Sequence, residues 1–137
     1  MSSFKIFDVA GTGMSAQSVR LNTTASNLAN ADSVSGDPTQ VYKARHPLFE
    51  AIRSGIGAKS ATTGVSVKGI VEAQGAPTAR YEPGNPLADT KGFVYAPNVN
   101  TVEEMVDMIS ASRSYQNNVE VMNTAKDMML ATLRLGQ

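Results

Sequence analysis

The side chains that could support catalysis or metal binding are few, and they do not cluster along this chain of 137 residues. His46 is the only histidine, and no paired acidic residues stand near it at metal-ligand spacing. Gly11-Thr12-Gly13 lacks the preceding strand and the following Lys-Ser/Thr that a phosphate-binding loop requires. Glu103 and Glu104 are adjacent, so on a helix they diverge, and their position at its start complements the helix dipole.

The composition excludes further classes of function. Without cysteine the chain has no disulfides, no thiolate catalysis and no cysteine-based zinc site. Twelve basic residues balance twelve acidic ones without a basic cluster for nucleic acid, and a near-neutral surface favours association of like copies. No apolar stretch approaches the roughly 20 residues of a membrane span. We expect no enzymatic activity, cofactor, metal, small-molecule substrate, nucleic acid or membrane insertion, and no cleaved signal peptide.

A narrow apolar stripe predicts a helix over about residues 4–31. Apolar residues recur every seven positions, at Phe7, Met14, Leu21 and Leu28. This spacing places them along one side of a helix. The intervening Gln17 and Thr24 are polar, and many Ser, Thr and Asn residues have modest helix propensity. Such a helix is marginal alone and needs a partner.

Residues 34–98 predict a β-rich insert. This segment holds all six prolines, which exclude long helices. The alternating runs at residues 65–68 and 93–95 predict strands, and residues 82–86 predict a turn.

A second long helix begins at Thr101, where Thr101 and Glu104 have the spacing of a capping box. No Gly or Pro follows until Gly136, which gives a helix of about 50 Å that must project from a domain of this size.

This second helix carries two apolar stripes. One contains Met105, Ile109, Ser112, Gln116, Val119, Leu130 and Leu133, and the other contains Met108, Ala111, Tyr115, Met122, Ala125 and Met129. Together they cover more of the circumference than one partner helix could hide. The pattern favours one intramolecular partner plus neighbouring subunits, with the core helix of an ordinary domain as the alternative.

These segments predict an α+β fold in which long N- and C-terminal helices pack as a coiled-coil-like pair around a small β-rich insert. The predicted domain divisions are 1–33, 34–98 and 99–137.

Two polar clusters do not fit a simple core. At the end of the first helix, Ser26, Asn27 and Asn30 either cap the helix locally or fix the register across subunits, as a buried Asn does in coiled coils. The second cluster, residues 110–118, has few charges and suits a partly wet subunit interface or a polar channel lining.

The run Ser26-Asn27-Leu28-Ala29-Asn30-Ala31-Asp32-Ser33 resembles the signature of bacterial flagellar rod, hook and hook-associated proteins. Residues 81–89, 92–95, 97–106 and 112–121 are similar to the proximal rod members of that family. The resemblance covers nearly the full length of the chain.

The resemblance implies a structural subunit of a tubular rod that spans the periplasm, transmits torque and encloses the export channel. It implies as partners copies of this chain, other rod proteins and the flagellar export apparatus, which exports subunits without a cleaved signal. The terminal helices would form the inner core and the insert would lie outside. We predict a subunit interface formed by Phe7, Met14, Leu21, Ser26, Asn27, Leu28, Asn30, Met105, Ile109, Tyr115, Val119, Met122, Met129 and Leu133.

Three other interpretations of the sequence are compatible with these patterns. The chain could be another rod or hook component, or a soluble adaptor or export chaperone that binds partners through its helices. A wall hydrolase would need convergent carboxylates, and Glu50, Glu72 and Glu82 are scattered without a motif.

Overall fold

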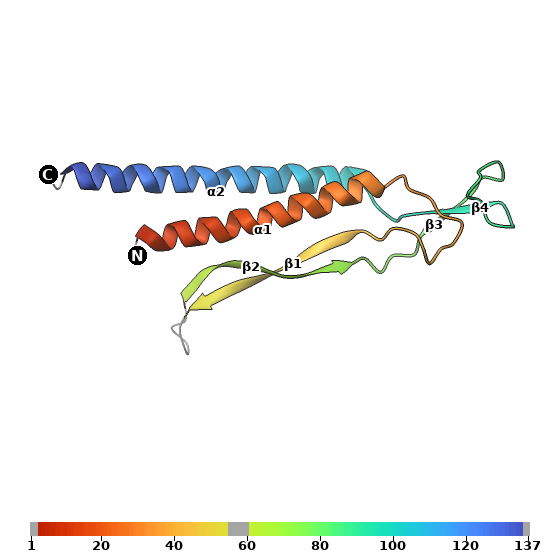
Figure 1. Ribbon diagram of the computed structural model, residues 1–137, viewed down its shortest axis with the longest axis horizontal. Coiled ribbons are helices and arrows are strands. Elements are labelled where there is room, and N and C mark those ends of the chain that lie inside the picture. Colours follow the sequence, from red (N-terminus) through yellow and green to blue (C-terminus); the bar gives the residue numbers. More distant parts are fainter. Residues whose placement is uncertain (1–2, 55–60, 136–137) are drawn as a thin grey trace.

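The computed structural model describes residues 3–54 and 61–135 and shows an elongated molecule (Figure 1). Its elements are α1 (Ser3–Asn30), β1 (Arg45–Ser54), β2 (Ala61–Glu72), β3 (Thr78–Tyr81), β4 (Phe93–Ala96) and α2 (Thr101–Leu135). The two helices run antiparallel, side by side, with the β-rich insert between them in sequence. The predicted α+β fold with a pair of long terminal helices is confirmed. The domain divisions at residues 33 and 98 stay a prediction.

The insert forms two separate two-stranded antiparallel sheets, β1–β2 and β3–β4. The β1–β2 hairpin folds back along α1, and among the described elements it contacts α1 and not α2. The β3–β4 sheet forms a tip beyond the end of the helices (Figure 1). The predicted runs at residues 65–68 and 93–95 lie in β2 and β4, whereas β1 and β3 were not predicted.

The start of α2 differs from the predicted capping box. Asn100 is the N-cap, because its Oδ1 accepts hydrogen bonds from the backbone N–H groups of Val102 (3.1 Å) and Glu103 (3.3 Å). The expectation that Thr101 and Glu104 cap each other is therefore wrong. Capping by Asn100 leaves the Glu104 side chain free to turn inward, where it is only 5% exposed.

Contacts between the helices follow a line spaced by seven residues on α1. Gly13 lies against the side chain of Asn118, Arg20 forms an ion pair with Asp107 at 2.8 Å, and Asn27 bonds to Glu104. The predicted seven-residue repeat is present, but this line lies one residue before the predicted seam. The seam residues themselves are half-buried beside it, at Phe7, Met14, Leu21 and Leu28.

The Gly11-Thr12-Gly13 segment lies inside α1, and the helix runs through it without a break. The Thr12 hydroxyl accepts a hydrogen bond from the backbone N–H of Val65 in β2 at 3.2 Å, which ties the hairpin to the helix. A Cβ at Gly13 would come within 2.9 Å of Asn118 Oδ1, whereas a Cβ at Gly11 would meet nothing within 4 Å.

These two glycines give a matched test of the helix contact. Gly11→Ala should raise stability by up to about 1 kcal/mol, because alanine favours a helix more than glycine does. Gly13→Ala should lose that gain or destabilise the chain, because the added methyl must displace Asn118, whose Nδ2 is bonded to Ser114 O at 2.8 Å. Denaturant unfolding of both variants measures the difference. Equal stabilisation of the two variants would show that the helices are not in close contact at this point.

Asp89 organises the tip. Its carboxylate accepts hydrogen bonds from the backbone N–H groups of Phe93 and Lys91, both at 2.8 Å, and from the Tyr95 hydroxyl at 3.4 Å. The Phe93 bond in particular lowers the pKa of the Asp89 carboxyl below its ordinary value of 3.8.

The lowered pKa of Asp89 sets the pH dependence of the tip. The stability that the ionised Asp89 carboxylate contributes is fully present above the unfolded-state pKa. It is lost as the pH falls through the folded-state pKa, below about pH 4. NMR spectra of the chain between about pH 6 and pH 2 should show the Phe93 amide changing with this titration. In Asp89→Asn the same amide should not respond. A Phe93 amide that is insensitive to pH in the parent chain would contradict the assignment.

Candidate assembly interface

One buried side chain joins the end of α1, the start of β1 and the first turn of α2. Asn27 is 0% exposed. Its Nδ2 donates to the backbone carbonyl of Arg45 at 2.9 Å and to Glu104 Oε1 at 3.0 Å. Its Oδ1 accepts from the Arg45 N–H at 2.8 Å and from the Tyr42 hydroxyl at 2.9 Å. Both donors and both acceptor positions of the amide are used, so Asn27 fixes the relative register of the three segments.

Two further groups extend this polar cluster. The hydroxyls of Tyr42 and Ser26 are 3.1 Å apart, and Ser26 is the donor because the Tyr42 proton points to Asn27. The Arg45 guanidinium lies 5.7 Å from the centre of the Tyr42 ring. Within the described part of the chain, the second carboxyl oxygen of Glu104 is buried without a hydrogen-bond partner. A half-satisfied buried carboxyl adds little stability, so the cluster serves mainly to specify one arrangement.

The structure separates the roles of the predicted polar residues at the end of α1. Asn30 bonds locally, with its Nδ2 donating to the Ser26 carbonyl at 2.8 Å, which matches the capping interpretation. Asn27 fixes register within the chain. Sequence reasoning missed Tyr42 and Arg45 as its partners, since nothing in their local sequence signals a contact with a residue 15 or 18 positions away. Contacts of these residues with neighbouring subunits stay a prediction.

The two apolar stripes of α2 face different surroundings. Ala111 and Ala125, from one stripe, are at most 2% exposed, and α1 is the only described element that packs against α2. Met122 and Met129 from the same stripe are half-buried. The other predicted interface residues of α2 are exposed, at Met105 (54%), Ile109 (55%), Tyr115 (37%), Val119 (36%) and Leu133 (68%). The structure therefore covers the stripe of Ala111 and Ala125 only in part, since Tyr115 belongs to it, and leaves most of the other stripe uncovered.

The chain exposes much more surface than a compact protein of its mass. Its accessible surface is 9435 Å², against about 6,900 Å² expected for a folded monomer of 14.5 kDa. Among the described residues, seven of the eight buried hydrophobic ones are alanines, the other being Val94. The surplus of roughly 2,500 Å² exceeds the ~1,600 Å² that a standard protein–protein interface buries in total. The shape suits a subunit that covers this surface by assembling.

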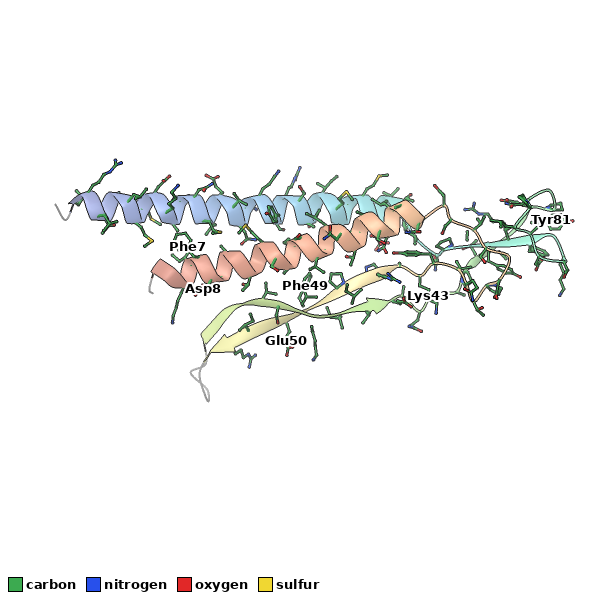
Figure 2. All side chains as sticks on the ribbon, viewed as in Figure 1. Phe7, Asp8, Lys43, Phe49, Glu50 and Tyr81 are labelled. Carbon is green, nitrogen blue, oxygen red and sulfur yellow. The ribbon has the colours of Figure 1, made fainter. Side chains whose placement is uncertain are left out.

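The hairpin is also only partly covered. Phe49 lies on the side of β1 that faces α1, whereas Glu50 points to the opposite side (Figure 2). Apolar side chains of the hairpin remain 38–52% exposed, at Leu48, Phe49, Ile52, Ile70 and Val71. Two-stranded sheets are marginal alone, so this hairpin depends on its contact with α1.

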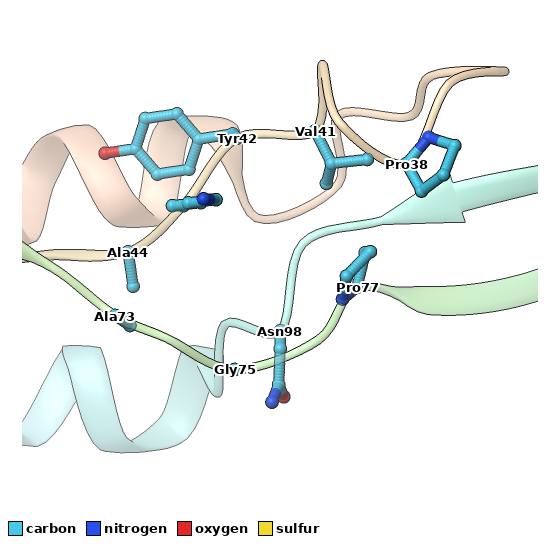
Figure 3. Close-up of a pocket in the computed structure, with 9 residues that line it drawn as sticks. Pro38, Val41, Tyr42, Ala44, Ala73, Gly75, Pro77 and Asn98 are labelled. Carbon is cyan, nitrogen blue, oxygen red and sulfur yellow. The ribbon is translucent and has the colours of Figure 1, made fainter.

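Two hollows among the described residues show how the candidate catalytic side chains are placed. A cavity of 60 Å³ lies where residues 38–44, the segment after β2 and Asn98 meet (Figure 3), and its lining is mainly apolar. A pocket of 250 Å³ at the start of α2 contains His46, Glu103, Glu104 and Asp107. Asp107 is paired with Arg20, and Glu104 is bonded to Asn27. The described residues form no cluster of His, Cys, Asp or Glu that could hold a metal ion.

Comparison with known proteins identifies the family. Residues 7–36 match the family described as "Flagella basal body rod protein", and residues 90–135 match the one described as "Flagellar basal body rod FlgEFG protein C-terminal". Proteins named flagellar basal-body rod protein FlgC are 56% identical in Escherichia coli and 54% identical in Salmonella typhimurium, over the full length of both chains. The Aquifex aeolicus protein of that name is 39% identical over 96% of each chain. The chain belongs to the FlgC family of flagellar basal-body rod proteins.

The matched segments cover most of the FlgC-family helix pair. The first match runs from Phe7 past the end of α1, and the second runs from the tip through α2. The β1–β2 hairpin lies between the two matched segments. Neither described helix contains an apolar run long enough to cross a membrane.

Asn27 gives a direct test of the polar cluster. Asn27→Ala should destabilise the chain by about 3 kcal/mol or more, because it removes the partner of the buried Glu104 carboxyl and of the part-buried Arg45 backbone groups. Asn30→Ala, which removes one local hydrogen bond in the same turn, should cost about 1 kcal/mol or less. Denaturant unfolding of the purified full chain measures both. Similar losses in the two variants would mean that Asn27 does not join the three segments.

Proposed function

We propose that this chain is a structural subunit of the flagellar proximal rod, which polymerises through α1 and α2 into a tube. The observation that supports this proposal most directly is that one apolar stripe of α2 is uncovered. The core of the helix pair itself is mostly alanine. Membership of the FlgC family supports a place in the basal body. The tube would cross the periplasm, transmit torque passively through many interlocking helices and enclose the channel through which later subunits pass.

The partners that follow are copies of this chain, other rod proteins and the flagellar export apparatus. We infer that the chain is exported without a cleaved signal peptide and orders its helices on assembly. Burial of apolar surface against neighbours would then supply stability that the small core of the isolated chain does not. In this arrangement the helices form the inner part of the tube, and the tip of β3–β4 points outward.

Two observations favour this function over the alternatives. A soluble adaptor or chaperone that folds stably alone would be expected to cover its apolar surface, whereas here Met105, Val106 and Ile109 are more than half exposed. A wall hydrolase needs two carboxyl groups facing one bond. Glu72 instead faces Arg45 at 3.5 Å, and Glu82 bonds to Asn85 at 3.0 Å in the tip.

The first test is whether the chain is part of the basal body. In cells of its source species, the chain should co-purify with detergent-resistant basal bodies and be absent from the pool of folded cytosolic protein. A chain that stays in the soluble fraction of such cells and is absent from their basal bodies would refute the proposal and favour the adaptor.

The interface itself is tested by placing a charge on it. Leu28→Asp and Val119→Asp should each abolish rod assembly and motility, because each would bury an unpaired charge between helices. Val119 is 36% exposed, so circular dichroism should show that Val119→Asp keeps its helices. Thr90→Asp, which adds the same charge at the exposed tip, is the control and should preserve motility. Normal motility of both interface variants would contradict the interface.

A further inference from the structure

Two uncovered apolar features lie at opposite ends of the helix pair. The first is a patch on the first two turns of α2, on the side away from α1. Its four members follow the i, i+3, i+4, i+7 pattern and are 54–68% exposed, at Val102, Met105, Val106 and Ile109. Farther along α2 the same face becomes polar, with Arg113, Gln116 and Glu120. The patch is therefore a local feature with a definite size and place.

The second feature is a groove at the other end, where the start of α1 lies beside the last turns of α2. It has a volume of 420 Å³ and is lined by Ile6, Ala125, Met128, Met129, Thr132 and Leu133. It continues along α2 into a second hollow of 400 Å³ that shares Ile6, Ala125 and Met128. The methionine side chains give the groove adaptable walls, which suit an apolar guest of irregular shape.

We propose that the patch of one copy fills the groove of a second copy of this chain. The inference rests on the proposed function, because it names the contact through which the subunits would polymerise. A second copy is the favoured occupant because each chain carries both halves of the contact, and because its surplus surface of roughly 2,500 Å² exceeds the ~1,600 Å² that a standard interface requires.

The positions of the two features determine what such a contact builds. Patch and groove are centred about 23 residues apart on α2, or roughly 35 Å along the helix. A contact between different surfaces at opposite ends joins subunits head to tail, and it leaves a free patch at one end of the row and a free groove at the other. Repetition of this contact extends an open row of subunits and does not close a dimer.

Cysteine cross-linking tests the contact, since the natural chain contains no cysteine. Val106→Cys marks the patch and Leu133→Cys marks the groove, and both positions are more than 60% exposed, so folding should be retained. The two variants are co-produced in cells without the natural copy, and basal bodies are purified after mild oxidation. A disulfide between residues 106 and 133 must join two copies, because neither chain carries both cysteines.

The expected result is a 106–133 disulfide at least about tenfold more abundant than in a control, because a disulfide forms only when the two Cα atoms are within about 7 Å. The control pairs Val106→Cys with Asn123→Cys, an exposed polar position between the two features. Cross-linking of Val106→Cys to itself, to another rod protein, or not at all in intact basal bodies would overturn the inference while leaving the proposed function standing. Absence of both variants and of the natural chain from basal bodies would refute the proposed function itself.

Discussion

The amide of Asn27 is the interaction on which the rest of the structure depends. It lies where the chain leaves α1, enters β1 and begins α2, and it bonds to the backbone of one segment and to a side chain of another. A backbone carbonyl and N–H accept only one alignment of an amide at these distances. Asn27 is the one described side chain whose hydrogen bonds reach both the hairpin and the second helix from α1, so it fixes both relative to α1. Elsewhere the elements meet mainly through small or half-buried side chains.

Specific contacts fix the arrangement of the two helices, but the apolar core between them is small. Alanines and Gly13 bring α1 and α2 close together but bury little apolar area, so the hydrophobic contribution of each contact is small. The larger side chains, such as Met105 and Ile109, lie on the outside. Geometry is thus set by specific contacts within the chain, while large apolar side chains stay exposed, as the proposed contacts between subunits would require. This division fits the proposed function, in which neighbouring subunits would cover the exposed apolar side chains and stabilise the helix pair.

The sequence predicted the features that repeat over many residues. Both helices followed from periodic apolar residues without interior proline, and the stripe of α2 that contains Ala111 and Ala125 is the more buried of the two. The contacts of Gly13 and Arg20 with α2 were missed because neither residue adds to an apolar pattern, and Asn27 was predicted as a capping or interface residue without its contact to α2. Strand β1 was missed because Pro47 lies within it and the adjacent apolar residues Leu48 and Phe49 break the alternation expected of a strand. The Asn27 cluster joins residues 15 to 77 positions apart, and no local pattern reports such a contact.

The placement of the chain ends also decides where this protein can be lengthened. The start of α1 and the end of α2 lie at the same end of the molecule, beside the groove that contains Ile6 and Leu133 (Figure 1). A fluorescent protein or an affinity peptide fused to either terminus would crowd that groove. The tip lies at the opposite end, and a side chain added at Gly84 there would meet only open space. An insertion after Gly84 is therefore the better position for a label that leaves the helix pair undisturbed.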